Sequence, residues 1–223
     1  MKKILKSKLV NGWQLFWLIS LTITIAVFFV ISTVDLGKAD EVSSMIQFTV
    51  RCSVPLLYLS FVASSYHALF PGVFSRWLLR NRKYIGVAYS AAMAWQLVFI
   101  IWLVTIFSEH YISNVYSFND IIIQVPGYIV LVAMTVTSFT FGRKLISPKQ
   151  WQVLHKWGIY FLWATVWSTY WYELFYYVGI DQPIDYIFYW AGFIVWSLRM
   201  AAWSIKHRQQ TNNLLRKTAN EKH

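Results

Sequence analysis

The chain has 223 residues, of which 57% are apolar, 19% aromatic and 13% charged, and its formal net charge is +11. A soluble domain usually has about a quarter charged residues, so this composition excludes an ordinary soluble domain. The basic residues form four clusters beside apolar runs, which favours anionic lipid headgroups over nucleic acid as their partner. The single cysteine, Cys52, excludes an intrachain disulfide and a cysteine-based metal cluster and is interpreted as a packing residue.

Apolar runs of about 20 residues or more predict an all-α integral membrane protein, a bundle of six transmembrane helices. A basic segment, 1–11, precedes them. A polar basic tail, 206–223, follows them and is expected to be frayed or disordered. The fifth helix is rich in Trp and Tyr, and we interpret it as the helix against which the others pack. In chain order the expected helices are 12–34, 45–70, 84–107, 121–142, 151–178 and 184–205.

The connecting segments predict the orientation of the bundle. Polar or basic loops are expected at 35–44, 75–83 and 108–120, and a tight turn at 179–183. If odd-numbered helices run outward, the inner loops and both ends of the chain hold almost all the basic residues, and the outer loops hold only Lys38. Basic loops stay on the cytoplasmic side, so the sequence predicts a multi-pass protein of the cell (inner) membrane with both termini in the cytoplasm.

Three segments resemble the ferric reductase-like transmembrane superfamily. Residues 76–87, RWLLRNRKYIGV, resemble the entry to its third helix. Residues 151–160, WQVLHKWGIY, match its W-x-x-L-H-[RK]-x-x-x-Y pattern, and residues 134–138, MTVTS, match the end of its fourth helix. The resemblance covers about residues 51–200 and is greatest to the haem-binding membrane subunits of bacterial methionine sulfoxide reductase systems.

The resemblance implies b-type haem between the third and fifth helices and a role as a transmembrane electron-transfer subunit of an oxidoreductase. His155 matches the first ligand of the fifth helix. Ser168 stands at the second ligand position of that helix, and Gln96 or Met93 stands at the third-helix position, where the family has histidine. The chain has no nucleotide-binding motif, so a redox partner protein is expected to supply electrons from a flavin or a quinone.

Depth along the helices offers two ligand pairs. His155, His67 and Met93 lie within about 10 Å of the cytoplasmic face at the helical rise of 1.5 Å per residue. A His155–His67 or a His155–Met93 haem site is therefore conceivable, and both kinds of ligation occur in cytochromes. The alternative is that both histidines are interfacial and Met93 is a packing residue. The chain would then be a haem-free family member acting as a membrane scaffold or assembly partner.

Four further expectations concern polar and aromatic residues. Gln96 is expected to form a hydrogen bond between helices, with a quinone or porphyrin edge as the alternative. Arg51 and Glu173 are expected to pair near the outer face, as a clamp between helices or as a proton or quinone site. Lys156 and Arg199 are expected to meet haem propionates or lipid phosphates. No catalytic triad or hydrolytic carboxylate pair can be defended. The aromatic residues at helical spacing, expected to pack or to wall a cofactor, are Tyr160, Trp163, Trp167 and Trp171.

Overall fold

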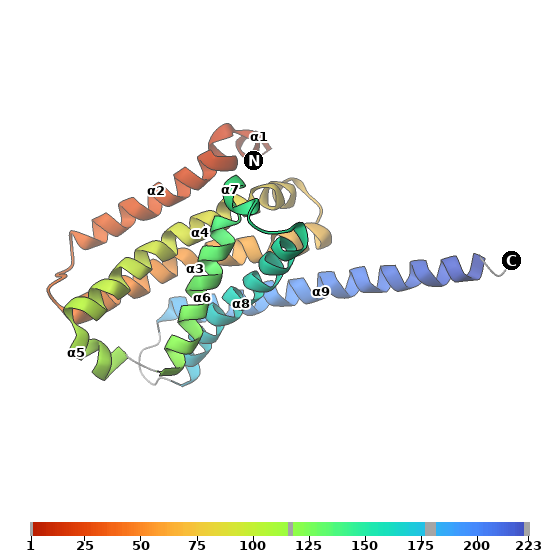
Figure 1. Cartoon of the computed structure of the whole chain (residues 1–223). Coiled ribbons are helices and arrows are strands. Elements are labelled where there is room, and N and C mark those ends of the chain that lie inside the picture. The colour runs from red at the N-terminus through yellow and green to blue at the C-terminus, as the bar shows by residue number, and fades with distance from the viewer. Residues whose placement is uncertain (1, 116–117, 177–181, 221–223) are drawn as a thin grey trace.

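The computed structural model describes residues 2–115, 118–176 and 182–220, and every regular element within these ranges is a helix. The all-α class is therefore confirmed for the described part of the chain (Figure 1). In chain order the elements are α1 (Lys2–Lys6), η1 (Lys8–Val10), α2 (Gly12–Ile31), α3 (Ala39–Leu69), α4 (Val73–Ile106), α5 (Ser108–His110), η2 (Tyr111–Val115), α6 (Phe118–Val136), α7 (Thr140–Arg143), α8 (Pro148–Phe175) and α9 (Pro183–Asn220).

Three helices, α2, α3 and α4, are long and apolar enough to cross a membrane, with mean hydropathies of 2.3, 1.4 and 1.9. The surface of α2 is compatible with lipid contact, since Ile25 is 68% exposed and Phe29 is 69% exposed. α6 adds a shorter apolar stretch, Gln124–Val136. α8 and α9 contain 28 and 38 residues, but their many Trp and Tyr rings have polar tips, which lowers their hydropathy.

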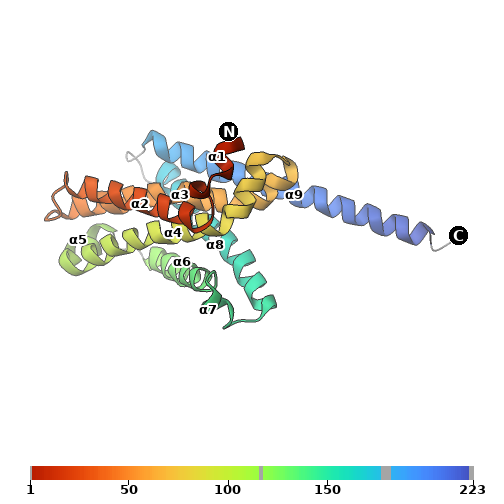
Figure 2. The same ribbon diagram turned by 90° about the horizontal axis from the view of Figure 1, so that it is seen from above.

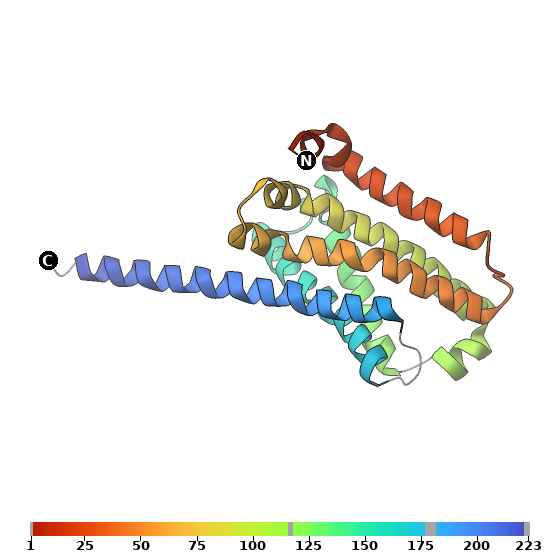
Figure 3. The same cartoon turned by 180° about the vertical axis from the view of Figure 1, so that it is seen from behind.

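Several boundaries differ from the sequence prediction. Helix takes up part of the expected loops at 35–44 and 108–120, since α3 begins at Ala39 and α5 begins at Ser108, and the expected helix 121–142 is interrupted between Val136 and Thr140. At two further places helix continues past the apolar runs. The expected loop at 75–83 is the first part of α4, which begins at Val73. The Ser75 hydroxyl accepts a hydrogen bond from the Gly72 amide at 2.8 Å at this helix start, and the Arg, Leu and Lys residues that follow are good helix formers. The tail, expected to be disordered, continues α9 to Asn220, and α9 extends well beyond the other helices (Figure 3).

The central helix of the bundle is α3, and the expectation that the fifth predicted helix holds this place was wrong. α3 contributes more buried side chains than any other described helix, whereas α8 buries only Gly158, Leu162, Val166 and Tyr170. α4 packs on both α2 and α3, and α9 packs on α3 and α8. Figure 2 shows α4 and then α6 to one side of α3. α6 packs on α8. The many large rings of α8 suggested a buried, central helix. Several of these rings, Trp157 and Trp171 among them, are instead exposed on the surface of the bundle.

Glycines allow the closest helix approaches. A Cβ on Gly158 of α8 would lie 2.5 Å from Met134 Sδ of α6. A Cβ on Gly192 of α9 would lie 2.5 Å from Trp167 Cδ1 and 2.6 Å from Tyr58 Oη. Small residues at helix interfaces are typical of membrane bundles because they let backbones approach closely.

The N-terminal segment is fastened to α4. Gly12 has a φ of 64°, a conformation that glycine adopts without steric cost. Its amide donates to Asn81 Oδ1 at 2.9 Å. The Asn81 amide group donates to Asn11 Oδ1 at 3.0 Å, and Trp77 Nε1 donates to the Val10 carbonyl at 2.8 Å. The start of α2 is thereby fixed against α4 at one end of the bundle.

Candidate functional site

A cavity of about 760 Å³ lies at the end of the bundle where α4 and α8 begin and α6 ends. Residues of α3, α4, α6, α7, α8 and α9 form its walls. Small residues on the facing helices leave this space: Ser60 and Ser64 on α3, and Gly86 and Ser90 on α4. We call this space the basic-end cavity. Ligand pockets in proteins typically have volumes of about 300–1,000 Å³, so the cavity has room for a large ligand.

All the charged side chains that line the basic-end cavity are positive. No Asp or Glu is among these lining residues. Positive charge concentrated in a hollow attracts anions, so the cavity suits a ligand that carries carboxylate or phosphate groups. The five cationic side chains that line it are Arg82, Lys83, Arg143, Lys156 and Arg199.

His155 stands in the wall of this cavity, on the second turn of α8. Its Nε2 lies 3.0 Å from Thr137 Oγ1. The Thr137 hydroxyl donates its own hydrogen to the Ala133 carbonyl at 2.7 Å, so we assign it as the acceptor and His155 Nε2 as the donor. This tautomer leaves the lone pair of Nδ1 to bind a ligand.

Residues around His155 hold the ring in place. The Trp151 ring centroid lies 4.5 Å from that of His155, and Trp151 Nε1 donates to the Thr137 carbonyl at 3.2 Å. The guanidinium of Arg143 lies 5.1 Å from the Trp151 ring. Arg82 and Arg143 both interact electrostatically with His155. The histidine is thus held between the turn after α6 and its own helix, beside the cations of Arg82 and Arg143.

Arg199 reaches the cavity from α9 and joins three helices. Its Nε donates to Tyr160 Oη at 2.8 Å on α8, and its Nη1 donates to the Phe61 carbonyl at 2.6 Å on α3. The guanidinium also lies 4.3 Å from the Tyr160 ring and 4.4 Å from the Phe61 ring. Arg199 and Lys156, the two residues expected to meet an anionic group, both line the cavity.

The other candidate ligand residues lie outside the cavity lining. His67 Nδ1 is 3.1 Å from Ser75 Oγ. Ser53 Oγ, which donates to the Val50 carbonyl at 2.8 Å, lies 3.3 Å from Met93 Sδ. Gln96 Oε1 accepts from Tyr128 Oη at 2.8 Å, which is the hydrogen bond between helices expected for it. Ser168 donates to the Thr165 carbonyl at 2.9 Å. The structure therefore brings His155, and not His67, Met93 or Gln96, to the cavity.

Sequence reasoning missed Thr137 and Arg143 as parts of the site. Thr137 belongs to the segment 134–138 that carries the resemblance, so its position in that motif could have marked it as a candidate site residue. Arg143 was expected only as one of the many basic residues on the inner side, although it lies eight positions before Trp151 and a short connection returns the chain to α8. The contact of Arg143 with Trp151 depends on the fold of α7 and is not visible as a pattern.

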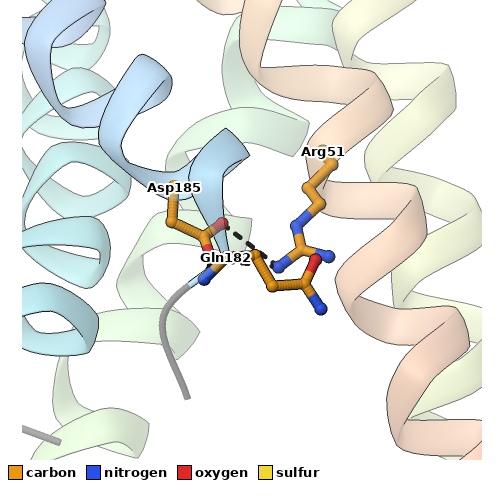
Figure 4. A network of polar contacts seen from close by, with 3 residues as sticks. All are labelled: Arg51, Gln182 and Asp185. Atoms are coloured by element: carbon orange, nitrogen blue, oxygen red, sulfur yellow. Dashed lines mark hydrogen bonds and ion pairs between the residues drawn. The ribbon is translucent and has the colours of Figure 1, made fainter. Parts of the chain in front are cut away.

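At the opposite end of the bundle, the ion-pair partner of Arg51 was predicted wrongly. Arg51 of α3 pairs with Asp185 of α9, and not with Glu173 of α8. Arg51 Nη2 lies 3.1 Å from each carboxylate oxygen of Asp185, and Figure 4 shows Gln182 beside them. The backbone N–H of Gln182 also donates to Asp185 Oδ2 at 3.2 Å. Asp185 lies in the first turn of α9, near the start of the expected helix 184–205, and its carboxylate meets Arg51 of α3.

The aromatic row of α8 joins this helix to α9. Trp163 Nε1 donates to the Gly192 carbonyl at 3.0 Å, and Trp167 Nε1 donates to the Tyr189 carbonyl at 3.1 Å. The Trp163 and Trp167 rings stack with centroids 5.7 Å apart. These contacts are packing interactions between helices, one of the two roles expected for the row.

Comparison with known protein families, with curated proteins and with solved structures finds no match for this chain.

Proposed function

We propose that the chain is a multi-pass membrane protein that holds b-type haem in the basic-end cavity, with His155 as an iron ligand, and acts as a transmembrane electron-transfer subunit. The observation that carries the proposal is the position of His155. It is the one lining histidine of a cavity of about 760 Å³ that has five cations in its walls.

The surroundings of His155 suit a metal ligand. Histidines that bind metals almost always donate their other ring N–H to a neighbouring acceptor, which fixes the tautomer and the ring orientation. The Thr137 hydroxyl, 3.0 Å from Nε2, supplies that acceptor, so the imidazole of His155 would be left with Nδ1 to hold the iron.

The cations suit the other end of the cofactor. Haem carries two propionate groups, and Arg82, Lys83, Arg143, Lys156 and Arg199 offer charge-assisted hydrogen bonds to carboxylates. Apolar side chains such as Leu131, Met134, Ile159 and Leu162 also line the cavity and would contact the ring. When bound, haem supplies one-electron transfer, and the chain's own residues bind it, orient it and limit its access to water.

The proposed topology has six spans with both termini in the cytoplasm of the cell (inner) membrane. Three spans rest on length and hydropathy, and the charge distribution supports the other three, because the basic-end cavity and the clusters around 76–83 and 143–149 then share the cytoplasmic side. A cytoplasmic flavin partner or a membrane quinone would exchange electrons with the cavity from that side.

A second candidate function is a haem-free membrane scaffold or assembly partner. The observation that favours it is the place of the other expected ligands. His67, Met93 and Gln96 have polar partners outside the cavity, so His155 is the one residue of the expected ligand set that lines it. The two functions differ in whether the purified protein contains haem.

The test is a reduced-minus-oxidised absorption spectrum with haem quantitation, made on protein expressed with ample haem. The cytochrome proposal expects a b-type signal near one haem per chain, lost in His155→Ala. The matched control is His110→Ala, at a histidine that lies outside the cavity and 3.7 Å from Asp40, and it should keep the haem. A flat spectrum from well-folded wild-type protein would leave the scaffold function.

A further inference from the structure

The polar cluster opposite the basic-end cavity contains one cation and two carboxyl groups. Arg51 of α3 and Asp185 of α9 form an ion pair, with the Asp185 side chain only 3% exposed. The backbone amide of Gln182 completes the coordination of Asp185. Glu173 of α8 is half-buried and interacts electrostatically with both Asp185 and Arg51. We call Arg51, Asp185, Glu173 and Tyr170 the outer cluster.

The two carboxyl groups differ in their hydrogen bonds. Asp185 accepts from the Arg51 guanidinium and from the Gln182 amide. Glu173 has no hydrogen-bond or ion-pair partner among the residues that the structure describes. An ionised carboxylate that is removed from water without a partner is strongly disfavoured. If both carboxyl groups were ionised, the outer cluster would carry one uncompensated negative charge.

The buried hydroxyl of Tyr170 lacks a hydrogen-bond partner among its described neighbours, which is a second, independent sign of a binding site in the outer cluster. Tyr170 is 2% exposed, and its hydroxyl has no hydrogen-bond partner within the described part of the chain. It lies one helical turn before Glu173 and interacts electrostatically with Glu173, Asp185 and Arg51. A neutral carboxyl group both donates and accepts hydrogen bonds. A protonated Glu173 could therefore both donate a hydrogen bond to the Tyr170 hydroxyl and accept one from it, whereas an ionised Glu173 could only accept one.

We propose that the outer cluster is a partly buried proton-binding site, in which Arg51 and Asp185 form a fixed ion pair and Glu173 takes up and releases the proton. On release, the Glu173 O–H bond breaks, the electron pair stays on the carboxylate, and the proton passes to water at the outer surface. The inference goes beyond the proposed electron-transfer function and does not depend on haem.

The described groups around Glu173 favour a proton over a metal cation. No group of three or more His, Cys, Asp or Glu side chains that could hold a metal ion occurs among the described residues, whereas Ca²⁺ takes about six to eight oxygen ligands. On the neighbouring helices, the titratable groups that face Glu173 and Tyr170 are Arg51 and Tyr58 of α3 and Asp185 of α9. Asp120, near the start of α6, lies outside the described side chains.

Infrared difference spectroscopy of the full-length protein in lipid nanodiscs tests the proposal. Exposed carboxyl groups are ionised at neutral pH, so a carboxylic acid C=O band that remains there reports a buried protonated group. We expect such a band in the wild type, its loss at alkaline pH and its absence at neutral pH in Glu173→Gln. Glu109→Gln, which changes an exposed carboxyl group of α5, is the matched control and should keep the band.

Three results would overturn the proposal. The first is a wild-type spectrum without an acid band at neutral pH, and the second is a band that persists in Glu173→Gln. The third is a band that appears only after Na⁺ and Ca²⁺ are removed from the buffer, because the site would then bind a cation. If Glu173→Gln does not fold, Glu173→Asp keeps the carboxyl group, and the band should shift in frequency and remain sensitive to pH.

Discussion

Thr137, directly after the end of α6, fixes His155 of α8 through a single hydrogen bond. The hydroxyl of Thr137 donates to the Ala133 carbonyl of α6 and accepts from His155 Nε2. The position of the ring therefore depends on a residue that is neither charged nor a metal ligand. The WQVLHKWGIY motif indicated that His155 matters, but its partner Thr137 lies in the turn after α6, 18 positions earlier, and no sequence period connects them.

Replacing Thr137 with valine keeps the shape of the side chain and removes the acceptor for His155. Under the cytochrome proposal we expect haem affinity to fall about 10- to 100-fold, the range for partners of metal-ligating histidines. Haem titration into the apoprotein, followed by absorption, measures this change. Ser138→Ala is the control, since Ser138 also lines the cavity but donates to the Met134 carbonyl. Equal affinity in wild type and Thr137→Val would show that this hydrogen bond does not position the ring.

Two ion pairs of the chain differ sharply in burial, which makes them a matched test. Asp185→Ala removes the partner of a half-buried arginine and is expected to cost about 3–5 kcal/mol in the free energy of unfolding. Asp35→Ala removes the exposed partner of Lys38, 3.5 Å away, and is expected to cost under about 1 kcal/mol. Thermal unfolding in detergent compares the two variants. Similar losses would mean that the Arg51–Asp185 pair does not clamp α3 to α9.

The sequence predicts the positions of the helices better than it predicts their ends. Most of each apolar run is helical, because a run of about 20 apolar residues has no alternative in lipid, although the expected helix 121–142 is interrupted between Val136 and Thr140. The helix ends were harder to predict, since α4 and α9 continue as polar helices at positions 75–83 and 206–220, where hydropathy gives no signal. The expected turn at 179–183 falls mostly outside the described residues.

Helix contacts at glycines predict a strong contrast between two alanine substitutions. Gly192→Ala introduces a Cβ about 2.5 Å from Trp167 Cδ1, so we expect α9 to shift and stability to fall by about 1–3 kcal/mol, as for other overpacked sites. Gly127→Ala in α6 meets nothing within 4 Å and is expected to be neutral or stabilising, because alanine favours helix. The measurement is the unfolding temperature in one detergent. A Gly192→Ala variant as stable as Gly127→Ala would contradict the close packing of α8 and α9.

The whole molecule has two polar regions at opposite ends of one helical bundle. The basic-end cavity uses the starts of α4 and α8, and the outer cluster uses the end of α8 and the start of α9. The sequence predicted the charge of each end from its loops. It did not predict the cavity, because the space depends on small residues, Ser60, Gly86 and Ser90, that face each other only after α3 and α4 have packed.

The proposed topology predicts the sides from which introduced cysteines react. In a Cys52→Ser background, Lys38→Cys should be labelled by a membrane-impermeant thiol reagent added outside intact cells. Lys144→Cys should be labelled only after the membrane is opened. Both side chains are exposed, so lack of access is not explained by burial within the protein. Labelling of Lys144→Cys from outside would reverse the assignment of the basic end to the cytoplasm.

The most direct test of the cavity as the haem site is to compare haem content in His155→Ala and His67→Ala, measured on equal amounts of folded protein. His155 lines the basic-end cavity, and His67 lies outside it beside Ser75. The proposed site predicts that His155→Ala loses the haem and that His67→Ala keeps it. Haem retained in His155→Ala and lost in His67→Ala would contradict the assignment and place the cofactor away from the basic-end cavity.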